Sequence, residues 1–220
     1  MKILILVLSC NDNGIYSKFF ESQKNTWDSI DVEGVETFYF FGDHDKNEII
    51  DNKILVDVKE VFVDPHGKSI ATNAGLKTLK TFELIQNMEF DYVFRTNSSS
   101  YIDKKLLHNY IVNKPITEYY SGVIGHHGNI VFASGSGFFL SKDLIKLLVD
   151  NKEKWDHTLI DDVLIGSLLK NFNISPQPNP RFDVVDSNIP SEYFHYRLKN
   201  KNRDSDIQYM YQIKNIKEKN

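Results

Sequence analysis

The feature that most constrains the fold is a short apolar run near the start of the chain, Ile3–Leu8, which polar residues follow at once. Six residues are far too few to cross a bilayer, and Ser9 and Asn11 come directly after them. An apolar run without alternation is typical of a strand that is covered on both faces, as in a parallel sheet. The run therefore predicts a buried first strand and neither a leader peptide nor a membrane span.

Helical and extended patterns alternate after this strand, as expected for a single domain of 220 residues. The first half predicts helices and strands over residues 14–30 (helix), 35–42 (strand), 53–58 (strand), 70–88 (helix) and 91–94 (strand). The second half predicts strands joined by glycine turns over 122–141, then a helix capped by Ser141 and a helix over 157–171. This order favours an α/β sandwich with a largely parallel sheet.

Charge and cysteine content limit the function classes. The net charge of −4 gives no indication of a nucleic-acid surface. Cys10 is the only cysteine, so no intramolecular disulfide forms, and a reducing, cytoplasmic setting fits. From Arg197 onward the chain has seven basic residues against three acidic ones. We expect residues 198–220 to be a basic, solvated tail, although a basic tail can also bind a phosphate or touch a membrane surface.

Two segments of the second half allow both a structural and a functional interpretation. Asp161 and Asp162 begin a predicted helix, where acidic residues favour the helix dipole, but a rigid carboxylate there can also act as a general base. Ser134–Ser141 contains two glycines before an apolar run, which fits a hairpin turn or a backbone that a sugar approaches closely. The residues alone leave both choices open.

The stretch Phe90–Leu107 raises the question of a metal. Its strand runs into Arg95 and then into four small polar residues, Asn97 to Ser100, with no carboxylate before Asp103. Hard divalent cations prefer carboxylate ligands, and neutral hydroxyl and amide oxygens bind them poorly. The end of this strand therefore lacks the ligands that a metal-dependent nucleotide site needs.

In their order along the chain, these motifs resemble the fringe-like and β-1,3-galactosyltransferase group of inverting glycosyltransferases. The resemblance covers about Lys2 to Arg197, which would form one domain before the tail. Its segments are Gln23–Trp27, Phe38–Gly42, Leu76–Leu84, Asp91–Asp103, Ala133–Leu144 and Ile160–Gly166. The last two are the most specific, and they match a small-glycine segment and an E-D-V-x-x-G motif.

The resemblance implies the GT-A fold, a Rossmann-type α/β/α sandwich, and transfer of a sugar from a nucleotide diphosphate sugar, most simply a UDP-sugar, to a hydroxyl of a glycan or other acceptor. Asp162 would be the general base, and Asp161 would position the acceptor or stabilise the site. The residues implied for the nucleotide sugar are Ser9, Asn11, Lys80, Arg95, Asn97 and Ser99. Those implied for the acceptor are Ser134, Gly135, Ser136 and Gly137.

The chain departs from this family at the metal motif, where Asn97-Ser98-Ser99 replace D-D-D. Three accounts follow. The enzyme works without a metal, with Arg95, Lys80, Arg197 or Lys199 stabilising the diphosphate; or Mn²⁺ or Mg²⁺ still binds through Asp103 or His195; or the domain binds a glycan or a nucleotide without catalysis. A nucleotidyltransferase would need a carboxylate-held Mg²⁺, which this sequence does not offer after the strand.

Overall fold

A computed structural model describes residues 1–11, 14–60 and 73–219 of the protein. The helices are α1 (Ile15–Asn25), α2 (Ala74–Ile85), α3 (Lys104–Ile111), α4 (Lys142–Asp150), α5 (Asp161–Lys170) and α6 (Arg203–Glu218), with 3₁₀ turns η1 (Trp27–Ser29) and η2 (Lys152–Lys154). The strands are β1 (Ile3–Leu8), β2 (Val35–Phe41), β3 (Glu48–Ile50), β4 (Lys53–Leu55), β5 (Tyr92–Asn97), β6 (Ser100–Ile102), β7 (Tyr120–His127), β8 (Ile130–Ser141), β9 (Gln177–Pro178), β10 (Phe182–Val184) and β11 (His195–Leu198). Residues 70–72 of the predicted second helix lie outside the described part.

The central sheet has eight strands in the order β3-β4-β2-β1-β5-β8-β7-β9. Strand β1 lies in the middle of the parallel part, between β2 and β5. Strand β8 joins this part in antiparallel orientation through β5 and pairs with β7. The predicted α/β class with a mostly parallel central sheet is confirmed. The unbroken apolar character of Ile3–Leu8 follows from its place, because five of its six residues are buried.

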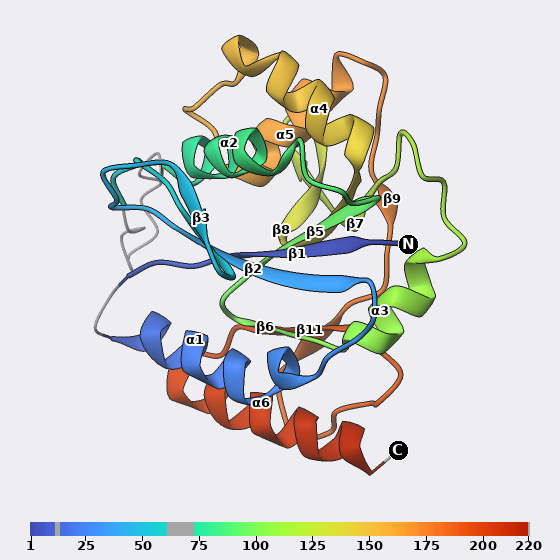
Figure 1. The fold of residues 1–220 in the computed structure, drawn as a ribbon. Helices are drawn as coiled ribbons and strands as arrows, with labels where there is room; N and C mark the ends of the chain where they lie inside the picture. The colour runs from blue at the N-terminus through green and yellow to red at the C-terminus, as the bar shows by residue number, and fades with distance from the viewer. Residues whose placement is uncertain (12–13, 61–72, 220) are drawn as a thin grey trace.

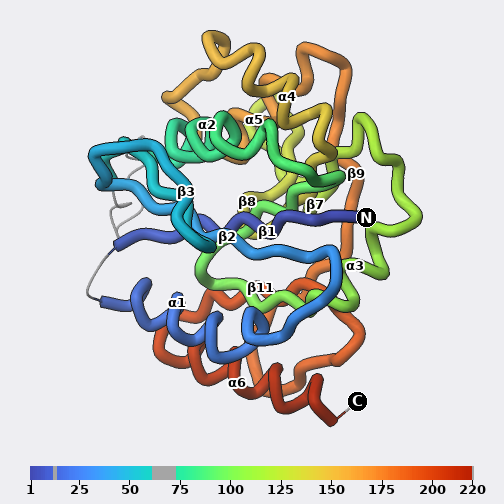
Figure 2. The backbone as a smooth tube through the Cα atoms, viewed as in Figure 1, coloured from blue at the N-terminus to red at the C-terminus, as the bar shows by residue number. Residues whose placement is uncertain are grey.

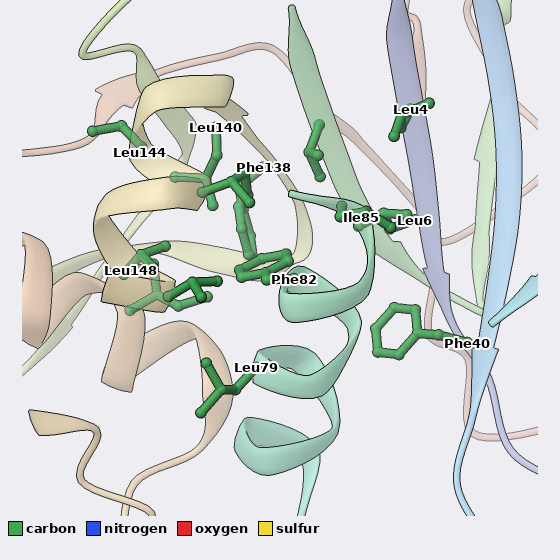
Figure 3. Packing of buried hydrophobic residues seen from close by; sticks show 14 of the residues in the cluster. Leu4, Leu6, Phe40, Leu79, Phe82, Ile85, Phe138, Leu140, Leu144 and Leu148 are labelled. Carbon is green, nitrogen blue, oxygen red and sulfur yellow. The ribbon is translucent and has the colours of Figure 1, made fainter. Parts of the chain in front are cut away.

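Helices cover both faces of the sheet (Figure 1). Helices α2, α4 and α5 lie on one face, and α1, α6 and a small sheet of β10, β11 and β6 lie on the other. The apolar core on the first face brings α2 and α4 against the sheet through Phe82, Leu148 and Phe138 (Figure 3). The core on the second face contains Trp27 and Tyr196, both fully buried. The molecule is therefore a three-layer sandwich with a second small sheet on one side.

The C-terminal segment is not a solvated tail. It starts at the last residue of β11 and contains the helix α6, which lies beside α1 in both backbone views (Figure 1 and Figure 2). Met210 and Ile213 are fully buried, and the Ser22 hydroxyl donates to the Met210 sulfur at 3.3 Å. The expectation of a solvated end was wrong because the basic residues of this segment lie among apolar ones at helical spacing. Within the described residues, no helix has the length and apolar character to cross a membrane.

Two helix starts show how local sequence sets the element ends. Asp103 caps α3 with a side-chain oxygen that accepts from the Leu106 amide at 3.0 Å, and Asn202 caps α6 by accepting from Asp204 at 3.1 Å. Ser141 precedes α4 as predicted, but its hydroxyl does not cap the helix. It accepts instead from the Tyr119 amide at 3.0 Å, which ties β8 to the start of β7.

Candidate active site

A pocket of about 330 Å³ lies at the carboxyl ends of β1 and β5. In the sheet register Leu8 pairs with Asn97, so these two strands end side by side. The chain passes from β1 to β2 on one side and later to β5 on the other, and ligands of open α/β sheets bind at such a change of direction. The pocket is lined by Leu8, Ser9, Cys10, Tyr16, Glu60, Ala74, Lys77, Asn97, Ser98, Ser99, Ile160, Asp161 and Arg203.

A larger cavity of about 890 Å³ lies elsewhere, beside Lys2, Glu36 and Asp91. It borders the starts of β1 and β2 and contains no predicted site residue. Since the amino ends of parallel strands are not where such sheets bind ligands, the smaller pocket is the better candidate.

The turn that closes the pocket floor is built by Asn97. Its side-chain oxygen accepts from the Ser99 amide at 3.2 Å and from the Ser99 hydroxyl at 3.1 Å, with the Ser100 hydroxyl at 3.3 Å. Asparagine commonly forms such local turns. The Ser98 hydroxyl donates to the Leu8 carbonyl at 2.9 Å, which joins the turn to β1. The two predicted donor-side residues of this turn, Asn97 and Ser99, thus line the pocket, with Asn97 engaged in shaping it.

A lysine of α2 reaches the pocket, but it is not Lys80. Lys77 is 3% exposed and donates to the Ser9 carbonyl at 2.7 Å and to Glu60 at 2.5 Å. Burial lowers the pKa of Lys77, and the charge of Glu60 opposes that effect. Lys80 lies one turn further along α2, where it pairs with Glu83 at 3.1 Å and does not line the pocket. The structure therefore places Lys77 where Lys80 was predicted.

Arg95 binds Asp161 and does not line the pocket. Its guanidinium forms an ion pair with the Asp161 carboxylate and donates to the Gly135 carbonyl. Arg95 is 2% exposed, and Thr78 also donates to Asp161, at 3.3 Å. An arginine fork that holds a carboxylate and a carbonyl fixes both groups in one geometry. Arg95 therefore ties the start of α5 to β8, and of the two acidic residues Asp161 is the one that lines the pocket.

Asp162 is held by two backbone amides. Gly135 donates to one side-chain oxygen at 2.6 Å, and Val163 donates to the other at 2.9 Å. Burial and then the neighbouring charge of Asp161 raise the pKa of Asp162 to about 6. A Cβ at position 135 would lie 3.0 Å from the Asp162 oxygen, so glycine permits this close approach. Asp162 is consequently a rigid carboxylate whose pKa lies near neutrality.

The other predicted residues are divided between the pocket and the structure around it. Ser9 lines the pocket, whereas Asn11 lies outside it, with its amide 3.3 Å from the His44 ring. Of the acceptor segment, Gly135 contacts Asp162, while the Ser136 hydroxyl accepts from Arg181 at 2.6 Å. The Ser134 hydroxyl lies 3.3 Å from the Ser136 hydroxyl, and Gly137 packs against the His195 ring.

His195 is fully buried and does not reach the pocket. Its Nε2 lies 3.3 Å from the Ser100 hydroxyl, and its ring stands edge-on to Phe94, with centroids 5.5 Å apart. Burial, followed by the charges of Arg181 and Arg197, lowers the pKa of His195 to about 3. The ring is therefore neutral and packed in the core.

The described residues at the pocket do not fit a divalent metal. Among the described lining residues the two carboxylates are Glu60 and Asp161, and each is paired with a cation, Lys77 and Arg95 respectively. In residues 1–11, 14–60 and 73–219, no three side chains of His, Cys, Asp or Glu come together in a group that could hold a metal ion. The oxygen donors near Asn97 are neutral and already hydrogen-bonded to one another.

Sequence reasoning missed several residues that line the pocket, among them Tyr16, Glu60, Lys77 and Arg203. One of them had a detectable signal. The tripeptide Leu-Lys-Thr occurs twice in succession in α2, and helices of such sheets begin near the ligand end of the strands. The earlier lysine, in the first turn, was therefore the better choice. Arg203 comes from α6, and nothing in the local pattern links that helix to β1.

Comparison with known proteins gives a family match over part of the chain and a similar fold. A sequence model of the Galactosyltransferase family matches residues 125–180, about a quarter of the chain. That region contains β8, α4 and α5, and thus both Gly135 and the Asp161–Asp162 pair. No curated protein matches the sequence. Solved structures add the fold.

The first similar structure is a glycosyltransferase involved in the glycosylation of the major capsid of PBCV-1, with a TM-score of 0.54 and 12% identity, covering 96% of this chain and 99% of that one. The fold is that of GT-A-like glycosyltransferases. The glycosyltransferase GlyE of Streptococcus pneumoniae TIGR4 is similar in two structures, with TM-scores of 0.50 and 0.52 and identities of 11% and 10%. Each match covers 96% of this chain and about 60% of GlyE.

Proposed function

We propose that this protein is an inverting glycosyltransferase that transfers a sugar from a nucleotide diphosphate sugar, a UDP-sugar in the simplest case, to a hydroxyl of a glycan or other acceptor. The observation that supports this most is the acidic pair at the start of α5. Asp161 lines the pocket at the ends of β1 and β5, and Asp162 stands beside it against the glycine-containing strand β8. The pair lies within the region that matches the Galactosyltransferase family.

Asp162 is the proposed general base. The acceptor oxygen forms its new bond to the anomeric carbon while the bond from that carbon to the diphosphate oxygen breaks, and the electron pair leaves with the diphosphate. The hydroxyl proton passes to the Asp162 carboxylate. A pKa of about 6 suits this role, because most of the carboxylate is ionised at neutral pH and still has appreciable proton affinity. Carboxylate oxygens have lone pairs beyond the two that Gly135 and Val163 occupy.

Asp161 and Arg95 are proposed to position this base. Their ion pair, with the Gly135 carbonyl as third member, fixes the first turn of α5 relative to β8. One oxygen of the Asp161 carboxylate already accepts hydrogen bonds from both Arg95 and Thr78. Asp161 therefore serves better as a rigid wall of the donor pocket than as the base.

The test compares three carboxylate variants in a transfer assay. Asp162→Asn is expected to lower turnover by about 10² to 10⁴, the usual contribution of a general base, and to leave UDP binding intact. Asp161→Asn is expected to weaken both turnover and binding. Asp150→Asn removes an exposed carboxylate of α4 and serves as the control, with turnover unchanged.

The competing function is a glycan- or nucleotide-binding domain without catalysis. It would be supported if wild-type protein bound UDP but turned over no UDP-, GDP-, CDP- or dTDP-sugar with any acceptor of a broad panel. If Asp162→Asn keeps its turnover, the protein is still an enzyme, but the assignment of Asp162 as the general base is refuted.

A further inference from the structure

A second cavity, of about 480 Å³, adjoins the pocket and is strongly basic. Tyr16, Asn97, Ser99 and Arg203 line both spaces, so one ligand can extend from the first into the second. The second cavity is completed by Arg197, Lys199, Asn200 and Lys201. Four of its eight lining residues are cations, and none is a carboxylate.

Two of these cations already have carboxylate partners outside the cavity. Arg197 lies 3.5 Å from Asp183, and Arg203 forms an ion pair with Asp206, which is fully buried. The two lysines between them, Lys199 and Lys201, are exposed and have no ion pair with any described residue. The cavity therefore has a net positive charge, because no carboxylate of a described residue pairs with either lysine.

The basic segment is attached to the Asn97 turn. The Leu198 amide donates to the Ser99 carbonyl at 2.8 Å, and β11 pairs with β6 so that Arg197 lies opposite Ser100. Arg203 donates to the Leu198 carbonyl at 3.1 Å, which holds the start of α6 against the same strand. Backbone pairing thus places these cations beside the turn whose side chains are neutral.

We propose that this cavity is the diphosphate subsite of the donor, and that Lys199 and Lys201, with Arg197 and Arg203, supply the positive charge that a carboxylate-held metal would otherwise provide. This inference rests on the proposed function for the identity of the ligand. A departing diphosphate is stabilised by cations and aligned N–H or O–H donors. Tyr16 brings a phenolic hydroxyl to the wall shared with the first pocket.

Calorimetric titration with inorganic pyrophosphate, UDP and uridine, each in the presence of EDTA, tests the subsite. Pyrophosphate and UDP are expected to bind without a metal, more weakly as the ionic strength rises, and uridine much more weakly than UDP. Lys199→Ala/Lys201→Ala should weaken pyrophosphate and UDP about tenfold or more, whereas Lys199→Arg/Lys201→Arg should restore most of the affinity. The control, Lys105→Ala/Lys146→Ala, removes the same charge from exposed positions of α3 and α4 and should change neither.

The subsite is refuted if pyrophosphate and UDP bind only with added Mn²⁺ or Mg²⁺, or if the double alanine variant binds as tightly as the control. These failures are separable from a failure of the proposed function. Sugar transfer that persists in the double alanine variant with unchanged KM for the donor would overturn the subsite alone. If pyrophosphate binds without a metal and depends on the two lysines, but no sugar is transferred, the subsite is supported and the proposed transferase activity is refuted.

Discussion

Replacing Asp162 by asparagine is expected to change how stability depends on pH. Burial is the main cause that raises the pKa of this carboxyl from 3.8 to about 6, and Asp161 adds to it. The folded protein therefore binds this proton more tightly than the unfolded chain does. As the pH rises from 3.8 to about 6, the folded state loses stability through Asp162, and below that window the carboxyl is protonated in both states.

The shift from 3.8 to about 6 corresponds to about 3 kcal/mol over the whole window, at about 1.36 kcal/mol per pH unit. Over the narrower range from about pH 4.5 to about pH 7.5, the free energy of unfolding of wild type falls by about 2 kcal/mol through Asp162. An asparagine has one acceptor oxygen, so it also loses the hydrogen bond from either Gly135 or Val163, at a cost of about 1 to 3 kcal/mol that does not vary with pH. The variant should be clearly less stable than wild type in acid and close to it at neutral pH.

Urea unfolding at the two pH values measures this directly. The difference in free energy of unfolding, wild type minus Asp162→Asn, should fall by about 2 kcal/mol from acid to neutral pH, or about 4 to 8 °C in Tm. Asp150→Asn should show no comparable change, because Asp150 is exposed. A difference that is the same at both pH values would refute the raised pKa, and with it the main reason for choosing Asp162 as a base poised near neutrality.

Three further predictions concern the pocket and its support. Gly137→Ala should lower the free energy of unfolding by about 1 to 3 kcal/mol, measured with urea, because its Cβ would lie 2.4 Å from the His195 ring; a neutral result would show that the ring moves aside. Lys77→Met should weaken UDP binding in calorimetry while Lys80→Met leaves it unchanged, and equal effects would argue against the pocket. Cys10, which lines the pocket, should react with iodoacetamide more slowly when UDP is present, and an unchanged rate would place the nucleotide elsewhere.

Much of the fold was predictable from local pattern. The unbroken apolar run of Ile3–Leu8 identified the central strand, and helical spacing identified α1, α2, α4 and α5. The C-terminal segment was misjudged, because the burial of Met210 and Ile213 depends on contacts with α1, almost two hundred residues earlier. Such contacts depend on tertiary packing, which cannot be predicted from the charge pattern of one segment.

Of the residues predicted for the site, Asp161 and the Asn97 turn line the pocket and Asp162 lies beside Asp161, whereas the predicted cations Lys80 and Arg95 do not line it. The Asp161–Asp162 pair and the Asn97 turn were singled out by their place in an order of motifs that resembles a known family, because acidic residues at a helix start and asparagine in a turn are common by themselves. By contrast, no sequence feature indicates that Arg95 binds Asp161, and the choice of Lys77 over Lys80 rests only on where a helix of such a sheet begins. Both facts depend on the angle at which a helix packs on the sheet.

The measurement that tests the central claim most directly is NMR of purified wild-type protein incubated with a UDP-sugar and a panel of sugar acceptors. Proposed transfer predicts the appearance of UDP together with a new anomeric proton whose configuration is opposite to that of the donor. Both signals should be lost in Asp162→Asn. A donor that remains intact with every nucleotide tried, or a product that retains the donor configuration, would contradict the proposal of an inverting glycosyltransferase.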